Sequence, residues 1–150
     1  MIGNNVDLQP TKSVYSVFKK VSDGAHGNTR GTHGSLTPCS LHKVLSAVHV
    51  YGRTFLDLGA GNGIVLAAAL TNGATNVHGI ELPENQANQY IFNAAMRKIA
   101  GTVVHKLPHR ARLEFEDIEK VLLASFTKCP PKYNSFSEIN RCLLCQLELR

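Results

Sequence analysis

The sequence has no tryptophan, no run of like charges and no apolar stretch long enough to cross a bilayer. Without such a stretch, and without the apolar core of a signal peptide, we expect an intracellular protein of the cytoplasm or nucleus that has no membrane partner. Aromatic residues make up 7% of the chain and charged residues 18%, against 43% hydrophobic residues. This is the composition of a globular protein, and 150 residues suffice for one domain with a core of its own.

Patterns of metal ligands are missing too. The four cysteines include one Cys-x-x-Cys pair, Cys142 and Cys145, without a second pair at the spacing of a zinc site. The seven histidines are dispersed and form no His-Glu-x-x-His motif. We therefore expect structural thiols and no metal. The net charge of +5 is compatible with an acidic or nucleic-acid partner, although the charges are scattered.

The most informative segment present runs from Phe55 to Gly63 and joins a short apolar strand to an acidic residue and three alternating glycines. Residues Arg53 to Leu58 alternate as a strand, and Ile64 to Leu70 looks helical. The glycines therefore lie at a strand-to-helix turn. Glycine suits a backbone that turns sharply with positive φ and approaches a ligand closely, so the turn is typical of a cofactor loop.

The spacing of this loop narrows the ligand. A dinucleotide site has the form G-x-G-x-x-G, whereas here the third glycine, Gly63, comes one residue early. A Walker phosphate loop is excluded, because neither Lys-Ser nor Lys-Thr follows. The D-x-G-x-G-x-G pattern resembles the first motif of class I S-adenosylmethionine-dependent methyltransferases. That resemblance implies that S-adenosyl-L-methionine is the cofactor, with Asp57 near its ammonium and Gly59, Ala60, Gly61 and Gly63 beneath its methionine part. The alternative is a glycine-rich turn without a ligand.

A second acidic residue follows at the end of the next strand. Asn76 to Leu82 is typical of a buried strand, which ends at Glu81 just before Pro83 opens another helix. A carboxylate at this place in a doubly wound sheet can accept hydrogen bonds from both hydroxyls of a ribose. A Glu before a helix is by itself more often a first-turn charge favoured by the helix dipole. Its place after the glycine loop favours a ribose ligand, with Leu82 beside it in the cofactor site.

A third acidic position lies after residues 111–116, which alternate as a strand. In the methyltransferase family the third strand ends in an acidic residue beside the adenine, and Asp117 with Ile118 resembles that pair. Asp117 could equally be the N-cap of the helix behind it. Glu116 is the neighbouring candidate if the register is shifted by one residue.

The segments around these motifs predict the remaining architecture. Residues 1–35 are rich in Gly, Asn and Ser and are expected to be a flexible segment with a short amphipathic piece from Val14 to Val21. Thr37-Pro38 is a good helix start. The apolar face of that helix is expected to pack on the sheet and contains Leu41, Val44, Leu45 and Val48. A helix over residues 84–100 is expected to bury Ala87, Tyr90, Ile91, Ala94 and Ala95, and Gly101 to end it.

The order strand, helix, strand, helix, strand predicts an α/β fold. Residues 36–150 are expected to form a Rossmann-like S-adenosylmethionine-binding domain with the sheet of a class I methyltransferase. The chain has room for about one strand past Asp117, whereas the full family fold uses about seven. The sheet is therefore expected to be truncated on its C-terminal side and the domain to be incomplete.

The acceptor is suggested by the segment before the first strand. Residues Thr32 to Leu41, followed by an amphipathic helix, look similar to the corresponding segment of the disruptor-of-telomeric-silencing type of histone lysine methyltransferases. His33-Gly34-Ser35 stands where that family has a Tyr-Gly-Glu turn. The resemblance implies methyl transfer to a macromolecule, most simply a protein (histone-like) lysine, while catalytic residues remain unassigned. The alternatives are a non-catalytic S-adenosylmethionine-binding or interaction module and a methyltransferase acting on nucleic acid; the missing G-x-G-x-x-G argues against an oxidoreductase.

Overall fold

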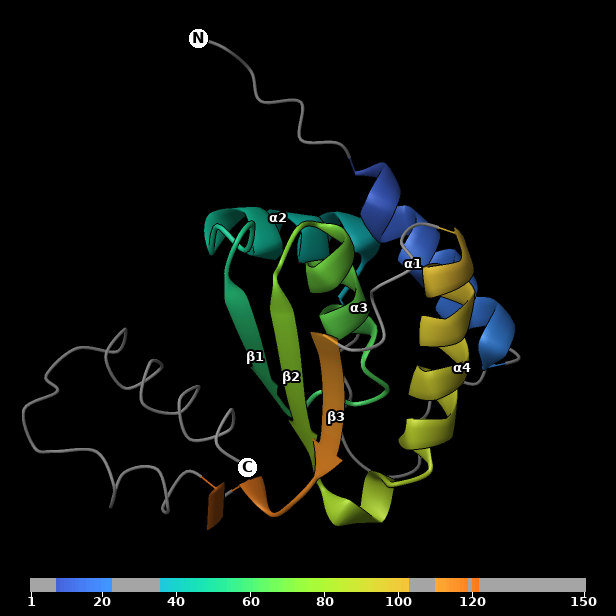
Figure 1. The fold of residues 1–150 in the computed structure, drawn as a ribbon, viewed down its shortest axis with the longest axis vertical. Helices are drawn as coiled ribbons and strands as arrows, with labels where there is room; N and C mark the ends of the chain where they lie inside the picture. The colour runs from blue at the N-terminus through green and yellow to red at the C-terminus, as the bar shows by residue number, and fades with distance from the viewer. Residues whose placement is uncertain (1–7, 23–35, 103–109, 119, 122–150) are drawn as a thin grey trace, which may run out of the picture.

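The computed structural model describes residues 8–22, 36–102, 110–118 and 120–121. Its elements in chain order are α1 (Gln9–Val21), α2 (Pro38–Ala47), β1 (Thr54–Leu58), α3 (Ile64–Thr71), β2 (Asn76–Glu81), the 3-10 helix η1 (Pro83–Asn85), α4 (Asn88–Thr102) and β3 (Ala111–Phe115). The three strands form a parallel sheet in the order β1-β2-β3 (Figure 1). This confirms the α/β fold class and the expected strands to within a residue. The further strand expected past Asp117 lies outside the described residues.

The parallel register brings the carboxyl ends of the three strands to one edge of the sheet. Thr54 pairs with Asn76, and Val77 pairs with Ala111. In Figure 1 the three arrowheads point to the same end of the molecule, while α2 lies toward the other end, where the strands begin. The glycine loop, the residues after β2 and the residues after β3 therefore meet at one edge.

Alternation along the strands separates two apolar clusters. Phe55, Val77 and Leu113 belong to the large core that the helices cover, whereas Leu56 and Ile80 belong to a smaller cluster with Ile118 and Val121. Because side chains of a strand alternate between faces, Asp57 and Glu81 share the face of Phe55 and Val77. Both carboxylates thus lie on the α3 side of the sheet.

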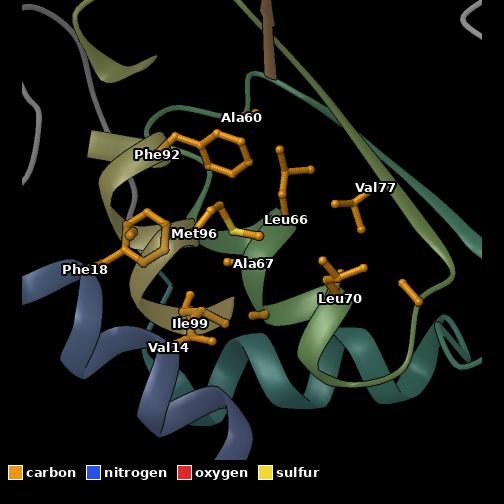
Figure 2. Packing of buried hydrophobic residues seen from close by; sticks show 14 of the residues in the cluster. Val14, Phe18, Ala60, Leu66, Ala67, Leu70, Val77, Phe92, Met96 and Ile99 are labelled. Atoms are coloured by element: carbon orange, nitrogen blue, oxygen red, sulfur yellow. The ribbon is translucent and has the colours of Figure 1, made fainter. Parts of the chain in front are cut away.

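The helices form a layer over that face. α3 packs on all three strands, and α1 packs against α3 and α4. Residues Leu66 to Leu70 of α3 are buried all round, as expected of a helix enclosed between a sheet and other helices. Figure 2 shows Phe92 and Met96 of α4 and Phe18 of α1 gathered around this helix.

α1 lies within the segment 1–35 that was expected to be flexible. Val14 and Phe18 are 1% and 2% exposed and belong to the same core as the sheet. The amphipathic piece from Val14 to Val21 is therefore part of a helix that starts earlier, at Gln9. The glycine-rich residues 23–35 lie outside the described part of the chain.

The start of α2 agrees with its sequence, but its apolar face differs. The Thr37 hydroxyl accepts a hydrogen bond from the Ser40 backbone N–H at 3.2 Å, and Pro38 is the first helical residue. Leu41 and Leu45 are buried, whereas Val44 and Val48 are exposed. The helix packs chiefly against α1, so the expected broad face across the sheet was wrong.

The buried face of α4 also differs from the expected one. The helix begins at Asn88 after η1 instead of at residue 84, and it continues past Gly101 to Thr102. Ala95 is buried and Ile91 packs partly buried against the core, as expected, but the inner side also carries Phe92, Met96 and Ile99. Tyr90, which was expected to be buried, is 78% exposed, and Ala87 is exposed. Alanines occur on two faces of this helix, so their positions do not show which face is buried. The large side chains of Phe92, Met96 and Ile99 mark the buried face.

Candidate functional site

The glycine loop after β1 adopts the conformation that only glycine takes readily. Gly59, Gly61 and Gly63 have φ values of +82°, +56° and +82°. A side chain at such positions would strain the backbone by about 1–2 kcal/mol. The predicted strand-to-helix turn is therefore present, and all three glycines of the motif have a backbone reason to be glycine.

The three glycines differ in what surrounds them. A Cβ placed on Gly59 or Gly61 would meet no atom within 4 Å, whereas one on Gly63 would lie 2.3 Å from Phe92 Cδ2. The first two glycines therefore leave open space beside the loop, into which a ligand can fit. Gly63 is required by packing of the loop against α4.

The N–H groups of the loop are turned toward β2. The backbone N–H groups of Gly59 and Ala60 both donate to the Ile80 carbonyl oxygen, at 2.8 and 3.1 Å. The Gly61 N–H donates to Glu81 Oε2 at 2.5 Å. A phosphate-binding loop presents its N–H groups to the anion, so in this conformation the loop offers no such cradle for a pyrophosphate.

The Glu81 carboxylate accepts more hydrogen bonds than the other carboxylates of the site. It is 6% exposed, and besides Gly61 it accepts from the Leu82 backbone N–H at 2.8 Å and from Asn85 Nδ2 at 2.9 Å, both on Oε1. A buried carboxylate is stable only when it is hydrogen-bonded in this way. These three donors fix the carboxylate at the open edge of the sheet.

Asp57 has a different environment. It is half-buried, and no donor among the described residues hydrogen-bonds to its carboxylate. Burial and, secondly, the negative charge of Glu81 raise the pKa of Asp57 to about 6. A cation placed near these two carboxylates would offset both effects. The site therefore favours a positively charged group close to Asp57.

The third acidic residue has a structural role in this conformation. Asp117 Oδ1 accepts from the Lys120 backbone N–H at 3.3 Å, which is an N-cap contact, and Oδ2 lies 3.9 Å from Lys120 Nζ. The Glu116 N–H donates to the Glu81 carbonyl oxygen at 3.0 Å, so the chain after β3 lies beside β2 at the same edge. The N-cap alternative for Asp117 is thus observed. Its place beside an adenine, and that of Ile118, stay predictions.

The residues present fit S-adenosyl-L-methionine. Open space lies beside Gly59 and Gly61, and the Asp57 carboxylate, to which none of the described residues donates, suits an ammonium. Two carboxylate oxygens offer about four acceptor sites, and Glu81 uses three of them. One ribose hydroxyl can therefore be added directly, while a second requires the exchange of one present donor.

Two residues that the sequence reasoning missed contribute to the site. Asn85 binds Glu81, and Phe92 supports Gly63. The signal for Asn85 was an amide side chain four residues after a strand-end glutamate with proline between them, which places it on a tight turn. Within the described residues there is no group of three or more possible metal ligands and no helix long and apolar enough to span a membrane. The Cys142 and Cys145 pair and the His33-Gly34-Ser35 turn lie outside them.

Comparison with solved structures gives a weak likeness in fold. The chain is similar to a crystal structure from Pyrococcus horikoshii named as a "putative RNA methyltransferase", with 16% sequence identity and a TM-score of 0.48. The match covers 72% of this chain and 52% of the other, so the chain spans about half the length of that protein. No family model and no curated protein matches the sequence. The functional interpretation therefore depends on the geometry of the site.

Proposed function

We propose that the chain binds S-adenosyl-L-methionine at the carboxyl ends of β1 and β2 and belongs to the methyltransferases. One observation carries the proposal: a half-buried Asp57 carboxylate, which has no donor among the residues that the structure describes, lies on the same face as Glu81, next to a glycine loop that is open at Gly59 and Gly61. This arrangement suits a nucleoside that carries positive charge.

The charge of the site argues against a dinucleotide. Asp57 and Glu81 would repel a pyrophosphate, and the N–H groups of Gly59 to Gly61 already have acceptors in β2 and Glu81. S-adenosyl-L-methionine carries a sulfonium and an ammonium, and the charge of its carboxylate can point to solvent. The same site therefore favours this cofactor over NAD.

Each residue has a defined part in the proposal. Asp57 holds the ammonium, and Glu81 accepts from the ribose. The backbone at Gly59 and Gly61 passes beneath the methionine part, where a side chain would fill the open space. Asp117 is proposed to lie beside the adenine. Its position supports this, because the preceding residue, Glu116, donates its backbone N–H to the Glu81 carbonyl oxygen.

The proposed acceptor is a protein lysine. When bound, the sulfonium supplies an activated methyl group, so the protein has chiefly to orient the amine and to exclude water. The nitrogen lone pair forms the new N–C bond, the S–C electron pair goes to sulfur, and the amine proton leaves to solvent. The similarity of residues 32–41 to histone lysine methyltransferases supports lysine, and the net charge of +5 keeps nucleic acid as the second acceptor to test.

Thermal denaturation tests the cofactor. S-adenosylmethionine and S-adenosylhomocysteine are expected to raise the Tm, Glu81→Gln to reduce the rise, and Glu84→Gln, at an exposed neighbouring position, to leave it unchanged. No shift with either ligand, together with a shift by NAD, contradicts the proposal.

Labelled cofactor tests the acceptor. Incubation with histones, other proteins and RNA is expected to label a protein at lysine. Label on RNA alone would replace the acceptor in the proposal. Tight binding without transfer to any of them would favour a non-catalytic cofactor-binding module.

A further inference from the structure

We propose that Asn85 positions the Glu81 carboxylate for a ribose, and that the hydrogen bond from Gly61 to Glu81 is the one the sugar displaces. The inference deepens the proposed function and rests on it. It concerns how a carboxylate whose acceptor sites are nearly filled can still accept a diol.

The donors to Glu81 divide between its two oxygens. Oε1 accepts from the Leu82 N–H and from Asn85 Nδ2, both from the segment that follows β2 directly. Oε2 accepts from Gly61, twenty residues earlier in the chain. Oε1 is therefore held by residues that are close to Glu81 in the sequence, while Oε2 faces the glycine loop.

The turn after β2 fixes Asn85. Pro83 opens η1, and the Asn85 backbone N–H donates to the Leu82 carbonyl oxygen at 3.0 Å. This tight turn brings the amide back to the strand end and leaves it half-buried. Asparagine suits the position because it supplies a neutral donor of the right length, whereas an aspartate there would repel Glu81.

The Gly61 contact is the easiest of the three to exchange. Gly61 is half-exposed with open space on its side-chain side, and Gly59 and Ala60 hold the loop to the Ile80 carbonyl independently. A ribose hydroxyl can donate to Oε2 and accept from the Gly61 N–H, so neither group loses its partner. With Oε1 held by Asn85, the carboxylate keeps its orientation during this exchange.

The test measures binding of S-adenosylhomocysteine and its 2′-deoxy and 3′-deoxy analogues by calorimetry. Asn85→Ala is expected to weaken the parent ligand about tenfold, and Asn85→Asp to weaken it more. Binding of the deoxy analogue that lacks the hydroxyl inserted between Glu81 and Gly61 is expected to weaken less than binding of the parent ligand, since one of its contacts with Glu81 is already absent. Gln86→Ala, at the exposed neighbouring position, is the matched control and should change none of them.

Equal losses for all three ligands would show that Asn85 is only structural and would overturn the inference. Wild-type protein that binds no S-adenosylhomocysteine would instead remove the proposed function, and this inference with it. Should the Asn85 variants fail to fold, the Gly61 amide proton in wild type provides a second measurement. Its NMR shift is expected to differ between the bound parent ligand and one deoxy analogue, and an identical shift in all complexes contradicts displacement at Gly61.

Discussion

The ring of Phe92 lies so close to Gly63 that a Cβ on this glycine would stand 2.3 Å from Phe92 Cδ2. The end of the glycine loop is therefore packed on α4. We expect Gly63→Ala to lower the free energy of unfolding by roughly 2–4 kcal/mol, because positive φ and overlap with a buried ring both oppose the methyl group. Urea denaturation measures the change.

Gly59→Ala provides the matched comparison. Its φ is the same, but its side-chain position is open, so only the backbone strain of about 1–2 kcal/mol is expected. Cofactor binding should instead be weakened more by Gly59→Ala than by Gly63→Ala, since a methyl group at Gly59 enters the proposed cofactor space. Equal stability losses in the two variants would contradict the separate roles of the first and third glycines.

Asp57 is predicted to cost stability at neutral pH. Its pKa of about 6 in the folded chain lies above the ordinary value of 3.8, so the folded protein binds this proton more tightly than the unfolded protein does. The contribution of Asp57 to stability is therefore most favourable below about pH 4 and declines as the pH rises through 6. We expect Asp57→Asn to be more stable than wild type at pH 7 by roughly 1–2 kcal/mol.

Denaturation at several pH values checks the effect of Asp57→Asn. The advantage of the variant should shrink between pH 6 and pH 4, as wild-type Asp57 becomes protonated. Glu84→Gln, which removes an exposed carboxylate, is expected to stay within about 0.5 kcal/mol of wild type. A lower stability of Asp57→Asn at pH 7 would mean that an unseen partner compensates the charge.

The titration of Asp57 should also affect ligand binding, but here the ionised carboxylate is the favourable form. The ionised form of Asp57 is the one that binds an ammonium, so S-adenosylhomocysteine is expected to bind about tenfold more weakly at pH 5 than at pH 7. Isothermal titration across this range measures the slope. In Asp57→Asn the affinity should be lower and the slope absent. A slope that persists in the variant would assign the titration to another group.

The fold was predictable where the signal is local. Positive φ requires glycine at the turn after β1, alternation gives the strand faces, and the all-apolar residues of α3 need burial on every side. The face of α4 was not predictable in this way. It depends on where η1 gives way to the helix and on which side chains fill the space against α1 and α3.

The candidate site shows the same division. Asp57 and Glu81 could be assigned from sequence, because parallel strands bring their ends to one edge. The partners of Glu81 could not, since its bonds to Gly61 and Asn85 depend on how two separate turns direct a backbone N–H and an amide. The role of Asp117 stays ambiguous, because an acidic residue between a strand and a helix is equally expected for an N-cap and for an adenine contact.

The register of α4 can be tested with two aromatic residues. Phe92 is 3% exposed and packs in the core, while Tyr90 is 78% exposed. Phe92→Leu is expected to cost roughly 1–2 kcal/mol through the lost packing, and Tyr90→Ala less than about 0.5 kcal/mol. The reverse order in urea denaturation would restore the face predicted from sequence.

A buried polar contact makes α1 part of the domain and supplies the last prediction. Thr11 is fully buried, and its Oγ1 accepts from Asn72 Nδ2 at 3.0 Å and lies 3.4 Å from His42 Nδ1. The hydroxyl thus connects α1 with α2 and with the end of α3. Thr11→Val keeps the volume and the β-branch but leaves an Asn72 N–H without its acceptor, so a loss of about 1–3 kcal/mol is expected. Ser16→Ala, at an exposed position of the same helix, is the control and should be nearly neutral. An equally small effect of both changes would mean that α1 contributes through its apolar face alone.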